Sequence, residues 1–496
     1  MTRRAPVIVV GAGFSGLAAA CHLRAAGHEV LVLETGDRPG GRAGLVEHRG
    51  YRFDTGPTVV TVLDVLAQPF RAVGTDIGEL CTLLPVDPVY RAHFHDGSSF
   101  ALPADTGAAT AAIDRFAGPA EARAYQQFLR WIGELHAAEL TQFIDRDVRS
   151  VLTLAADAGA LARLVRLGAF RSWYSTVSRL FADERLRRLF SFQALYAGVS
   201  PIEALGLLAV IAHMDTVQGV YAPLGGTAAL AEGLATAAAK AGVELAYGTP
   251  AAAVTARPKP AVRLGDGTTV DASAVVVTAD LPVAYDELLG VAPPRRVDRA
   301  VAAPSCVVWH LATSGPLPAG SAHHNVHFGQ AWDDAFDEIL GRPGRPATDP
   351  SRFVTIASLS DPTAAPPGGH GLFVLEPVPN LSADVDWERE TPRLTDRMLA
   401  WADGAGYPMR GAELVTVVDP PAWRHQGAAH GTPFSFAHRF RQSGPFRPAP
   451  EDRRLPGVVF AGAGTRPGLG LPLVTISGRI AAERAHHFVV QQGKSA

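Results

Sequence analysis

The stretch VIVVGAGFSGLAAACHLRAAGHEVLVLE, residues 7–34, decides the fold of this chain. Its first four residues are all apolar, as in a strand that is buried on both faces of a parallel sheet. A GxGxxG pattern follows, which allows a tight turn, close approach of a pyrophosphate and close helix packing; its glycines are Gly11, Gly13 and Gly16. A helical pattern from Ser15 then leads to a second strand, which ends at Glu34, an acid placed to accept from a ribose hydroxyl. The stretch predicts a βαβ unit that binds a dinucleotide.

Composition limits the remaining possibilities. The chain has 496 residues, of which 47% are hydrophobic and 19% charged, so we expect a globular protein of two or three domains. The formal net charge is -3 with interspersed signs, which argues against a nucleic-acid partner. Three scattered cysteines, Cys21, Cys81 and Cys306, favour a reducing cytosol over a disulfide framework or a zinc site.

No targeting or spanning segment is predicted. Arg3 and Arg4 precede an apolar run as in a signal peptide, but glycines end that run after residue 10. The apolar stretch 204–214 is well short of the ~20 residues that a membrane-spanning helix needs. We expect a protein that is soluble or peripherally attached to a membrane.

A second glycine-rich loop lies near the end of the chain, in GVVFAGAGTRPGLGLPLVTISGRIAAERA from Gly457. An apolar run breaks into glycines that permit backbone contact, and a helical pattern restarts near Leu473. Pro467 and Pro472 stiffen the loop. The pattern indicates a strand, a loop and a helix that approach a bound group closely.

Glu34 disfavours a 2′-phosphate but does not separate NAD from FAD. Two further segments distinguish FAD from NAD, namely GDRPGGRAG (36–44) and YRFDTGPTVV (51–60). With the βαβ unit, they resemble the FAD-binding signature that flavin amine oxidases and carotenoid desaturases share. The resemblance implies that Gly40, Gly41 and Arg42 lie against the pyrophosphate and the ribityl chain of FAD. A second GxGxxG is not found, so the electrons are expected to come from an organic substrate.

The C-terminal loop resembles that of the bacterial phytoene desaturases in particular. Ala463 stands where the wider amine oxidase group usually has an aspartate, which favours the desaturase branch. Further segments resemble this family in the same order over nearly the whole chain: 50–61, 84–100, 187–201, 219–235, 323–329, 374–381 and 431–448.

The resemblance implies FAD as cofactor, with both ends of the chain holding it. Ala251 matches the position whose backbone pairs with adenine, and the helix near Leu473 directs N–H groups at the pyrimidine edge of the flavin ring. The implied cofactor-binding residues are Gly11, Gly13, Phe14, Ser15, Gly16, Glu34, Gly40, Gly41, Arg42, Thr55, Gly56, Pro57, Thr58, Ala251, Gly462, Ala463, Gly470, Pro472, Leu473 and Val474. The proton acceptor stays unknown, because a histidine or a carboxylate would serve and no spacing selects one.

The implied function is desaturation of a linear isoprenoid such as phytoene, by hydride transfer to flavin N5 and loss of a proton. A membrane quinone or oxygen would reoxidise the flavin. The alternatives are an isomerase, ketolase or saturase acting on a carotenoid, or an amine oxidase. A flavin-free isoprenoid chaperone is disfavoured by the intact glycines, Glu34 and Arg42.

The expected fold class is α/β, with a discontinuous Rossmann-like FAD-binding domain from residues 1–100, 219–290 and 451–496. The second segment carries a hairpin signal at Asp266-Gly267. A helical insert is expected at 101–218 and a mixed substrate domain at 291–450.

Two interpretations of the insert stay open. In residues 152–181, Leu161, Leu164 and Val165 fall on one helical face, and arginines fall opposite. With Phe170, Trp173 and Tyr174, this segment is either a bundle helix or a membrane-facing helix on a cytoplasmic protein at the inner face of the cell membrane.

Three further features of the sequence say less about function. Phe190, Phe192 and Tyr196 line a substrate tunnel or belong to the core. The histidines His323, His324 and His327 lack a carboxylate at ligand spacing, so no metal site is predicted. Two positions depart from the desaturase pattern, Leu224 in place of an arginine and a missing proline after Thr61; both are expected beside the flavin or its substrate.

Overall fold

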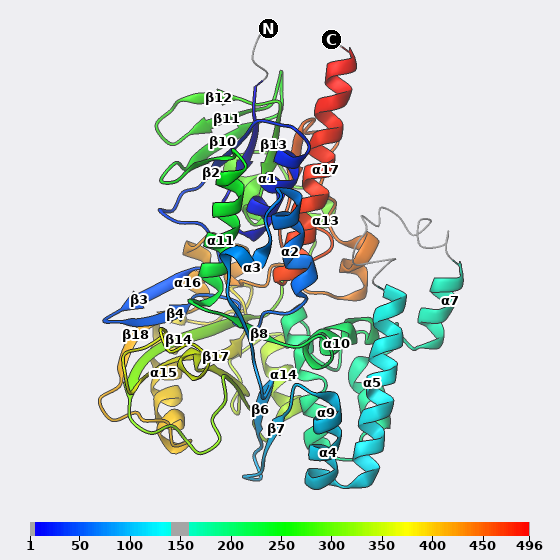
Figure 1. Ribbon diagram of the computed structural model, residues 1–496, viewed down its shortest axis with the longest axis vertical. Helices are drawn as coiled ribbons and strands as arrows, with labels where there is room; N and C mark the ends of the chain where they lie inside the picture. The colour runs from blue at the N-terminus through cyan, green and yellow to red at the C-terminus, as the bar shows by residue number, and fades with distance from the viewer. Residues whose placement is uncertain (1–4, 140–157, 496) are drawn as a thin grey trace.

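The computed structural model describes residues 5–139 and 158–495 and has a mixed α/β fold (Figure 1). A five-stranded parallel sheet lies at the end of the molecule where both termini emerge. Its strand order is β19–β13–β1–β2–β9, namely Val458–Phe460, Ala274–Val277, Val7–Val10, Val30–Leu33 and Glu244–Ala246. Strand β1 is central, and its Val7 pairs with Ala274 on one side and Val30 on the other.

Strand β1 is apolar throughout because both of its faces are covered. Val7 and Val9 face a core made with helices α1 (Phe14–Ala25), α2 (Leu63–Ala72), α11 (Gly226–Lys240) and α17 (Leu471–Ser495). Ile8 and Val10 face the opposite core, against the antiparallel strands β10 (Ala251–Thr255), β11 (Ala261–Leu264) and β12 (Thr269–Asp271). The unbroken run of apolar residues therefore reflects a doubly covered strand.

A second, seven-stranded sheet follows the order β18–β14–β17–β16–β15–β6–β7. These strands are Glu413–Val418, Ser305–Ser314, Gly369–Val378, Arg352–Thr355, His324–His327, Tyr90–His93 and Ser99–Leu102. All neighbours are antiparallel except β15 and β6, which run parallel. Alternate residues of β14 face helix α15 (Trp387–Gly404), while the others face the inside of the molecule.

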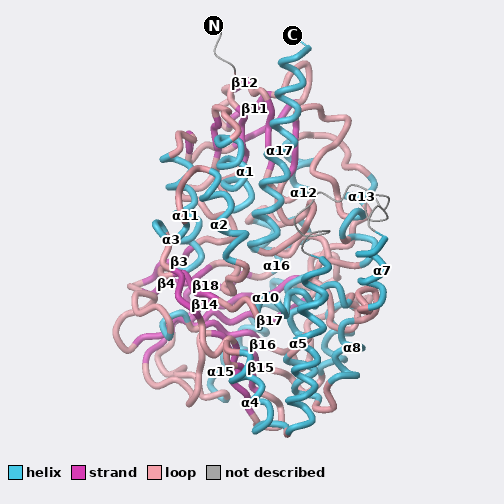
Figure 2. The backbone as a smooth tube through the Cα atoms, turned by 45° about the vertical axis from the view of Figure 1, so that its right-hand side comes forward, coloured by secondary structure: helices cyan, strands magenta, loops and turns pink. Residues whose placement is uncertain are grey.

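Helices gather at one side of the seven-stranded sheet, as Figure 2 shows for α5, α7 and α8. They are α4 (Thr106–Ala117), α5 (Pro119–Glu139), α7 (Ala158–Arg166), α8 (Trp173–Leu180), α9 (Glu184–Leu189) and α10 (Val210–Thr216), with short helices η2 (Phe192–Ala197) and η3 (Gly206–Ala209). A stack of aromatic rings, which includes Phe128, Phe181 and Phe190, holds α5 and α9 together.

Short elements connect these layers. They are β3 (Leu45–His48), β4 (Tyr51–Asp54), α3 (Ile77–Leu80), β5 (Leu83–Pro85), β8 (Tyr221–Pro223), α12 (Leu281–Val283), η4 (Ala284–Leu288), α13 (Arg295–Asp298), α14 (Trp332–Leu340), η5 (Ala357–Leu359), α16 (Pro420–His425), η6 (Ala429–Gly431), η7 (Phe440–Gln442) and η8 (Gly444–Phe446).

The amphipathic segment differs from its expected form. Residues 152–157 lie outside the described part; helix α7 ends at Arg166, and the Ser172 side chain caps the separate helix α8. Trp173 is fully buried because it packs in the helical core, so for this residue the bundle interpretation holds and the membrane-facing one does not. Leu164 is buried, whereas Val165 is 60% exposed. Within residues 5–139 and 158–495, no helix is long and apolar enough to cross a membrane.

Candidate cofactor and substrate site

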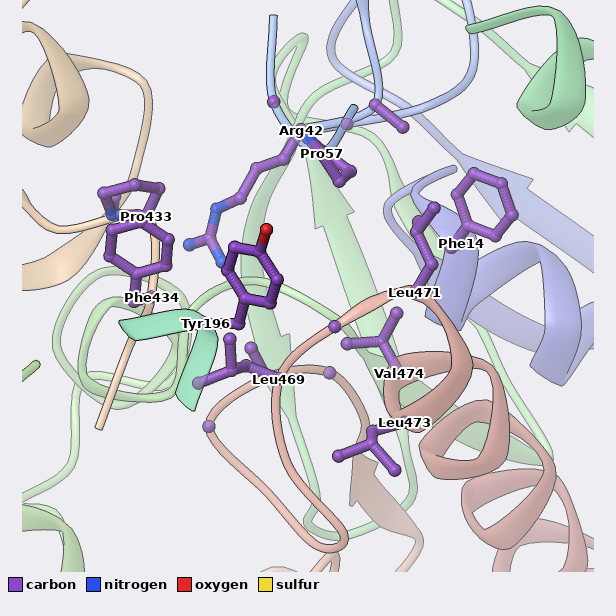
Figure 3. A pocket seen from close by; sticks show the side chains of 18 of the residues that line it. Phe14, Arg42, Pro57, Tyr196, Pro433, Phe434, Leu469, Leu471, Leu473 and Val474 are labelled. Atoms are coloured by element: carbon purple, nitrogen blue, oxygen red, sulfur yellow. The ribbon is translucent and has the colours of Figure 1, made fainter. Parts of the chain in front are cut away.

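A cavity of about 1190 Å³ lies between the two sheets (Figure 3). Val10 and Leu33 border it from the carboxyl ends of β1 and β2, and Phe353 and Phe373 border it from the seven-stranded sheet. Ligands of parallel α/β sheets bind outside the carboxyl ends of the strands. The cavity therefore occupies the position that the parallel sheet makes available to a ligand.

The first glycine loop has a backbone that admits only glycine at two places. Gly11 has φ of 103°, and a Cβ there would lie 2.3 Å from Thr278 Oγ1. A Cβ at Gly16 would lie 2.0 Å from the Gly11 carbonyl oxygen, so α1 packs directly on the turn. Helix α1 begins after Gly13 without a side-chain cap. Its first N–H groups are thus available to an anion at the positive end of the helix dipole.

Glu34 is held at the end of β2 by two backbone donors. Its Oε2 accepts from the Ala12 N–H at 2.7 Å, and its Oε1 accepts from the Gly36 N–H at 2.8 Å. The carboxylate borders the cavity beside the glycine turn. This is the position from which an acid can accept from a ribose hydroxyl.

The segment 40–58 forms another wall of the cavity. Gly40 makes a parallel bridge with Gly13, and Thr55 Oγ1 donates to the Arg42 carbonyl at 3.2 Å. The Arg42 side chain reaches into the cavity in Figure 3, and its guanidinium lies 3.9 Å from the Asp280 carboxylate. Asp280 is itself fixed, because it accepts from the Ala429 N–H at 2.8 Å and from Ser435 Oγ at 3.0 Å.

The C-terminal loop closes the cavity from the other end of the chain. Gly462 has φ of 117° and its N–H donates to Ser477 Oγ at 3.0 Å, which ties the loop to α17. Helix α17 begins at Leu471, directly after Gly470 with φ of 100°. The Leu471, Leu473 and Val474 side chains lie at this helix start in Figure 3.

A buried arginine supports that loop. Arg447 is fully buried and donates to the carbonyl oxygens of Thr465 (3.1 Å), Phe436 (3.3 Å) and Ala463. Burial lowers the Arg447 pKa to about 9, while the Asp280 charge acts in the opposite direction. Neither Arg447 nor Asp280 was identified from the sequence. Asp280 could have been recognised from the sequence, because it follows the buried strand β13 at the same sheet edge as Glu34. No sequence pattern distinguished Arg447.

Nearly all of the sequence-predicted cofactor residues border this one cavity. They are Gly11, Gly13, Phe14, Ser15, Glu34, Gly40, Gly41, Arg42, Thr55, Gly56, Pro57, Thr58, Ala251, Gly462, Ala463, Gly470, Pro472, Leu473 and Val474. Gly16 lies behind the lining, where it permits contact between α1 and the turn. The cavity thus brings together residues from the first 60 positions, from β10 and from the chain's last 40.

The far part of the cavity is apolar. Its wall includes Phe192, Leu195, Tyr196, Leu207, Leu208, Val210, Ile211 and Met214 from the helical region, Val326 from strand β15, and Phe328 and Trp332 from the residues after that strand. Phe192 and Tyr196 border the cavity, whereas Phe190 lies in the aromatic core. Of the two alternatives for these aromatic residues, lining of the cavity applies to Phe192 and Tyr196, and the core applies to Phe190.

Two acids interrupt this apolar wall, and neither was identified from the sequence. Asp215 is 2% exposed, and the Tyr90 hydroxyl donates to its Oδ2 at 2.6 Å. Burial raises the Asp215 pKa to about 7 despite that hydrogen bond. Glu139, at the end of α5, has a pKa raised well above its usual range by burial. The available signal for Asp215 was an acid at the end of an apolar run, in ALGLLAVIAHMD.

Other sequence expectations resolve differently. Leu224 is 39% exposed and is absent from the cavity lining, because it directly follows β8, its backbone N–H donates to the Thr82 carbonyl, and Gly225 turns the chain. The expectation that it lies beside the flavin or substrate was wrong, while Thr61 does border the cavity. His324 and His327 lie on β15, and among the described residues no group of three or more potential ligands can hold a metal ion.

The polar part of the cavity fits FAD. The uncapped start of α1 suits a pyrophosphate, Glu34 suits a ribose, and the open space beside Gly470 leaves room for a group against the start of α17. The apolar part continues from this place and suits an extended hydrocarbon. One cavity thus combines a dinucleotide cradle with an apolar chamber.

Comparisons with known proteins agree with this arrangement. The family model described as "Flavin containing amine oxidoreductase" matches residues 14–486. The chain is 44% identical to the phytoene dehydrogenase of Streptomyces griseus, over 96% of this chain and 94% of the relative. It is 34% identical to the zeta-carotene-forming phytoene desaturase of Myxococcus xanthus, over 99% and 95% of the two chains. It is also 34% identical to the lycopene-forming phytoene desaturase of Pantoea ananas, over 96% and 98%.

Solved structures share the fold at lower sequence identity. An oxidoreductase from Methanosarcina mazei aligns with a TM-score of 0.63 at 16% identity, over 96% of this chain and 99% of that one. Putrescine oxidase, in its wild-type form bound to putrescine, aligns with a TM-score of 0.62 at 17% identity, over 99% of both chains.

Proposed function

The chain belongs to the flavin containing amine oxidoreductase family and, within it, to the bacterial phytoene desaturases, and from this premise we propose that it desaturates phytoene or a close linear relative towards lycopene-type polyenes. The protein is an FAD-dependent oxidoreductase. The observation that carries the proposal is the single cavity in which a dinucleotide cradle opens into an apolar chamber.

The chain's own residues have defined roles in this proposal. The first turn of α1, Glu34 and Arg42 hold the polar parts of FAD, and the start of α17 lies against its ring. The chemistry that FAD supplies when bound is two-electron oxidation, with removal of a hydride from the substrate. A hydrocarbon offers no polar handle, so its affinity comes from buried area at about 25 cal/mol per Å². The apolar wall orients the substrate and excludes water.

The predicted division of the chain into domains matches these cofactor-binding and substrate-binding roles. Residues 1–100, 219–290 and 451–496 form the FAD-binding domain, and each supplies strands to the five-stranded sheet. Residues 291–450 provide most of the second sheet, to which β6 adds from the first segment and β7 adds across the predicted boundary at residue 100. Residues 101–218 form the helical insert, which contributes the apolar wall of the chamber.

Collection of substrate from a membrane is part of the proposal. Four apolar side chains are exposed in or next to the helical region: Val165 (60%), Phe170 (37%), Ile202 (42%) and Phe440 (51%), the last on η7. The Phe170 and Phe440 rings meet edge to face at 6.2 Å, and Arg439 pairs with Glu203, next to Ile202, at 3.4 Å. We name these four residues the apolar patch.

The apolar patch suits the inner face of the cell membrane. Arg163, Arg166, Arg171 and Arg441 are exposed beside it, and basic groups favour the anionic lipids of that face. The cavity wall lies directly behind, since the N–H of the cavity residue Leu207 donates to the Ala169 carbonyl at 2.8 Å. A lipid-soluble substrate would thus enter from the bilayer, and a membrane quinone or oxygen would accept the electrons.

The proposed activity is tested with purified protein reconstituted with FAD and mixed with phytoene in liposomes, without NAD(P)H. We expect new visible absorbance, and product chromatography gives the number of double bonds introduced. Unchanged phytoene in the presence of both quinone and oxygen would reject the proposed substrate.

Membrane attachment is tested by liposome co-sedimentation of the Phe440→Ser/Val165→Ser variant. We expect weaker binding than wild type, most clearly with anionic lipid. The control is Leu414→Ser, which removes an exposed leucine on β18 at the opposite edge of the molecule (Figure 1). Equal binding of all three proteins would reject the apolar patch as the docking surface.

A further inference from the structure

Asp215 is a carboxyl group placed in an apolar wall without a charged partner. It lies on α10 and borders the cavity with its helix neighbours Ile211 and Met214. Its Oδ2 accepts from the Tyr90 hydroxyl at 2.6 Å. Throughout the part of the chain that the structure describes, Asp215 forms no ion pair. A buried acid without a cation is costly to ionise, so its presence in a hydrocarbon chamber calls for a reason.

The position of α10 brings this carboxyl near the proposed reaction site. Val210 and Met214 pack in one apolar cluster with Leu473 and Ile476 from the first turns of α17. Asp215 directly follows Met214, and Tyr196 borders the same cavity (Figure 3). The acid therefore lies where the apolar chamber meets the loop and helix that are proposed to hold the flavin ring.

We propose that Asp215 is the catalytic base of the desaturation, with Tyr90 as the residue that positions its carboxylate. This inference rests on the proposed function. Two hydrogens leave adjacent carbons of the substrate. One departs as a hydride, which carries both electrons of its C–H bond to the oxidant FAD. The other departs as a proton to the Asp215 carboxylate, and the electrons of its C–H bond become the second bond of the new C=C.

The groups around Asp215 leave it as the best proton acceptor. Burial raises the pKa of the Tyr90 and Tyr196 phenols, so both stay protonated. Burial raises the pKa of Glu139 on α5 well above the usual range, which disfavours its carboxylate form. Asp215, with a pKa of about 7, is partly ionised there and still has appreciable basicity.

The histidines nearby are placed differently. His136 on α5 and His213 on α10 stack on each other with ring centroids 4.2 Å apart, and neither borders the cavity. His324 lies on β15, next to the Tyr90 ring of β6, and its Nε2 is 3.2 Å from the Thr58 carbonyl oxygen. His438 borders the cavity but lies against Gly468 of the C-terminal loop. From α2 and α17, the side chains that meet α10 are apolar, namely Val65, Ile476 and Ile480.

The test compares wild type with Asp215→Asn, which keeps the shape and can still accept from Tyr90. We expect unchanged FAD content and phytoene binding, with a polyene formation rate lower by about 100-fold or more. The wild-type rate should rise with pH through about 7 as the carboxylate ionises, and the variant should lose this rise. Asp215→Glu should recover part of the rate, because it restores a carboxylate.

An infrared titration gives a readout that does not depend on turnover. Wild type should show a carboxylic acid C=O band that disappears as the pH rises through about 7, and Asp215→Asn should lack that band. Glu139→Gln tests the other acid of the same wall, and Asp114→Asn, at an exposed aspartate on α4 outside the cavity lining, is the control that should keep both the rate profile and the band.

The outcomes separate the two proposals. If wild type forms polyenes and Asp215→Asn forms them at the same rate with the same pH profile, the assignment of the base is overturned and the function stands. If Glu139→Gln removes the pH dependence, the base is Glu139 and the assignment is again wrong. If wild type forms no polyene, the proposed function fails, and the role of Asp215 fails with it.

Discussion

Single residues in this molecule are unusual mainly where charge is buried. Arg447 donates to the carbonyl oxygens of Ala463 and Thr465 in the C-terminal loop and to those of Phe436 and Gln442, without a carboxylate partner at hydrogen-bonding distance among the described residues. Asp215 occupies an apolar wall with one tyrosine as donor. Such groups cost stability unless their hydrogen bonds are satisfied, and perturbed acids of this kind cluster at functional sites. Each should therefore leave a measurable trace in the stability of the apo-protein.

The pH dependence of stability tests the Asp215 environment. The folded-state pKa is raised to about 7, against ~3.9 in an unfolded chain. The folded protein thus holds the extra proton, and this stabilising contribution is complete below ~4 and lost as pH rises through about 7. We expect the unfolding free energy of wild type, relative to Asp215→Asn, to fall by up to about 4 kcal/mol between pH ~4 and ~8. Urea unfolding across this range measures it.

The control for this experiment is Asp114→Asn, which changes an exposed aspartate on α4. Its difference from wild type should stay small and vary little with pH. A difference for Asp215→Asn that stays constant from pH ~4 to ~8 would contradict a raised pKa in the folded protein.

Among the elements, the contact between α1 and α17 joins the two ends of the chain. The helices lie side by side in Figure 1, and Gly478 of α17 packs directly against α1. A Cβ at this position would lie 2.3 Å from the Ser15 carbonyl oxygen and 2.9 Å from the Ala18 Cβ. Ridges of larger residues would hold the helices further apart. The small residue thus sets the position of both helix starts at the cavity.

Gly478→Ala should therefore destabilise the protein by about 1–3 kcal/mol through overpacking, and it should lower FAD affinity because the two helix starts shift. Gly404→Ala is the matched control, because Gly404 ends α15 with no heavy atom within 4 Å of an added Cβ. It should change stability by less than about 1 kcal/mol. Equal effects of the two substitutions in urea unfolding and FAD titration would contradict the packing argument.

The local sequence predicted elements better than their partners. The βαβ unit at 7–34 follows from periodicity and glycine spacing, and the loop from Gly462 follows from its composition. The pairing of β6 with β15 joins Ala92 to Val326 across more than 200 positions, and no local pattern carries that information. Trp173 shows the same limit, since the tertiary core and not the helix pattern decides that it is buried. Asp215 was missed because its burial depends on distant segments.

At the scale of the whole molecule, the cavity joins distant parts of one chain. Gly11 and Gly470 border the same space, although 458 positions separate them in the sequence. A ligand that contacts both parts binds the folded protein and not the unfolded chain. FAD should therefore act as a stabilising link as well as the oxidant.

We expect FAD at 100 times its Kd to raise the unfolding free energy of the apo-protein by about 2.7 kcal/mol. Gly11→Ala should lose this gain, because a Cβ there meets Thr278 Oγ1 at 2.3 Å and the φ of 103° is strained for alanine. Gly133→Ala, within α5 and open to an added Cβ, should keep it. Denaturant unfolding with and without FAD measures the gain. A gain in Gly11→Ala equal to wild type would contradict the proposed role of the turn.

The strand order of the parallel sheet has a consequence for synthesis on the ribosome. Strand β1 emerges first, but its neighbour β13 follows some 270 residues later, and the edge strand β19 and helix α17 emerge among the last residues. Until then, the face of α1 that α17 will cover remains open to water, and partly folded chains with exposed apolar surface are prone to aggregate. This face therefore stays uncovered until α17 has been made, and FAD cannot contact both glycine loops before the second of them has been made.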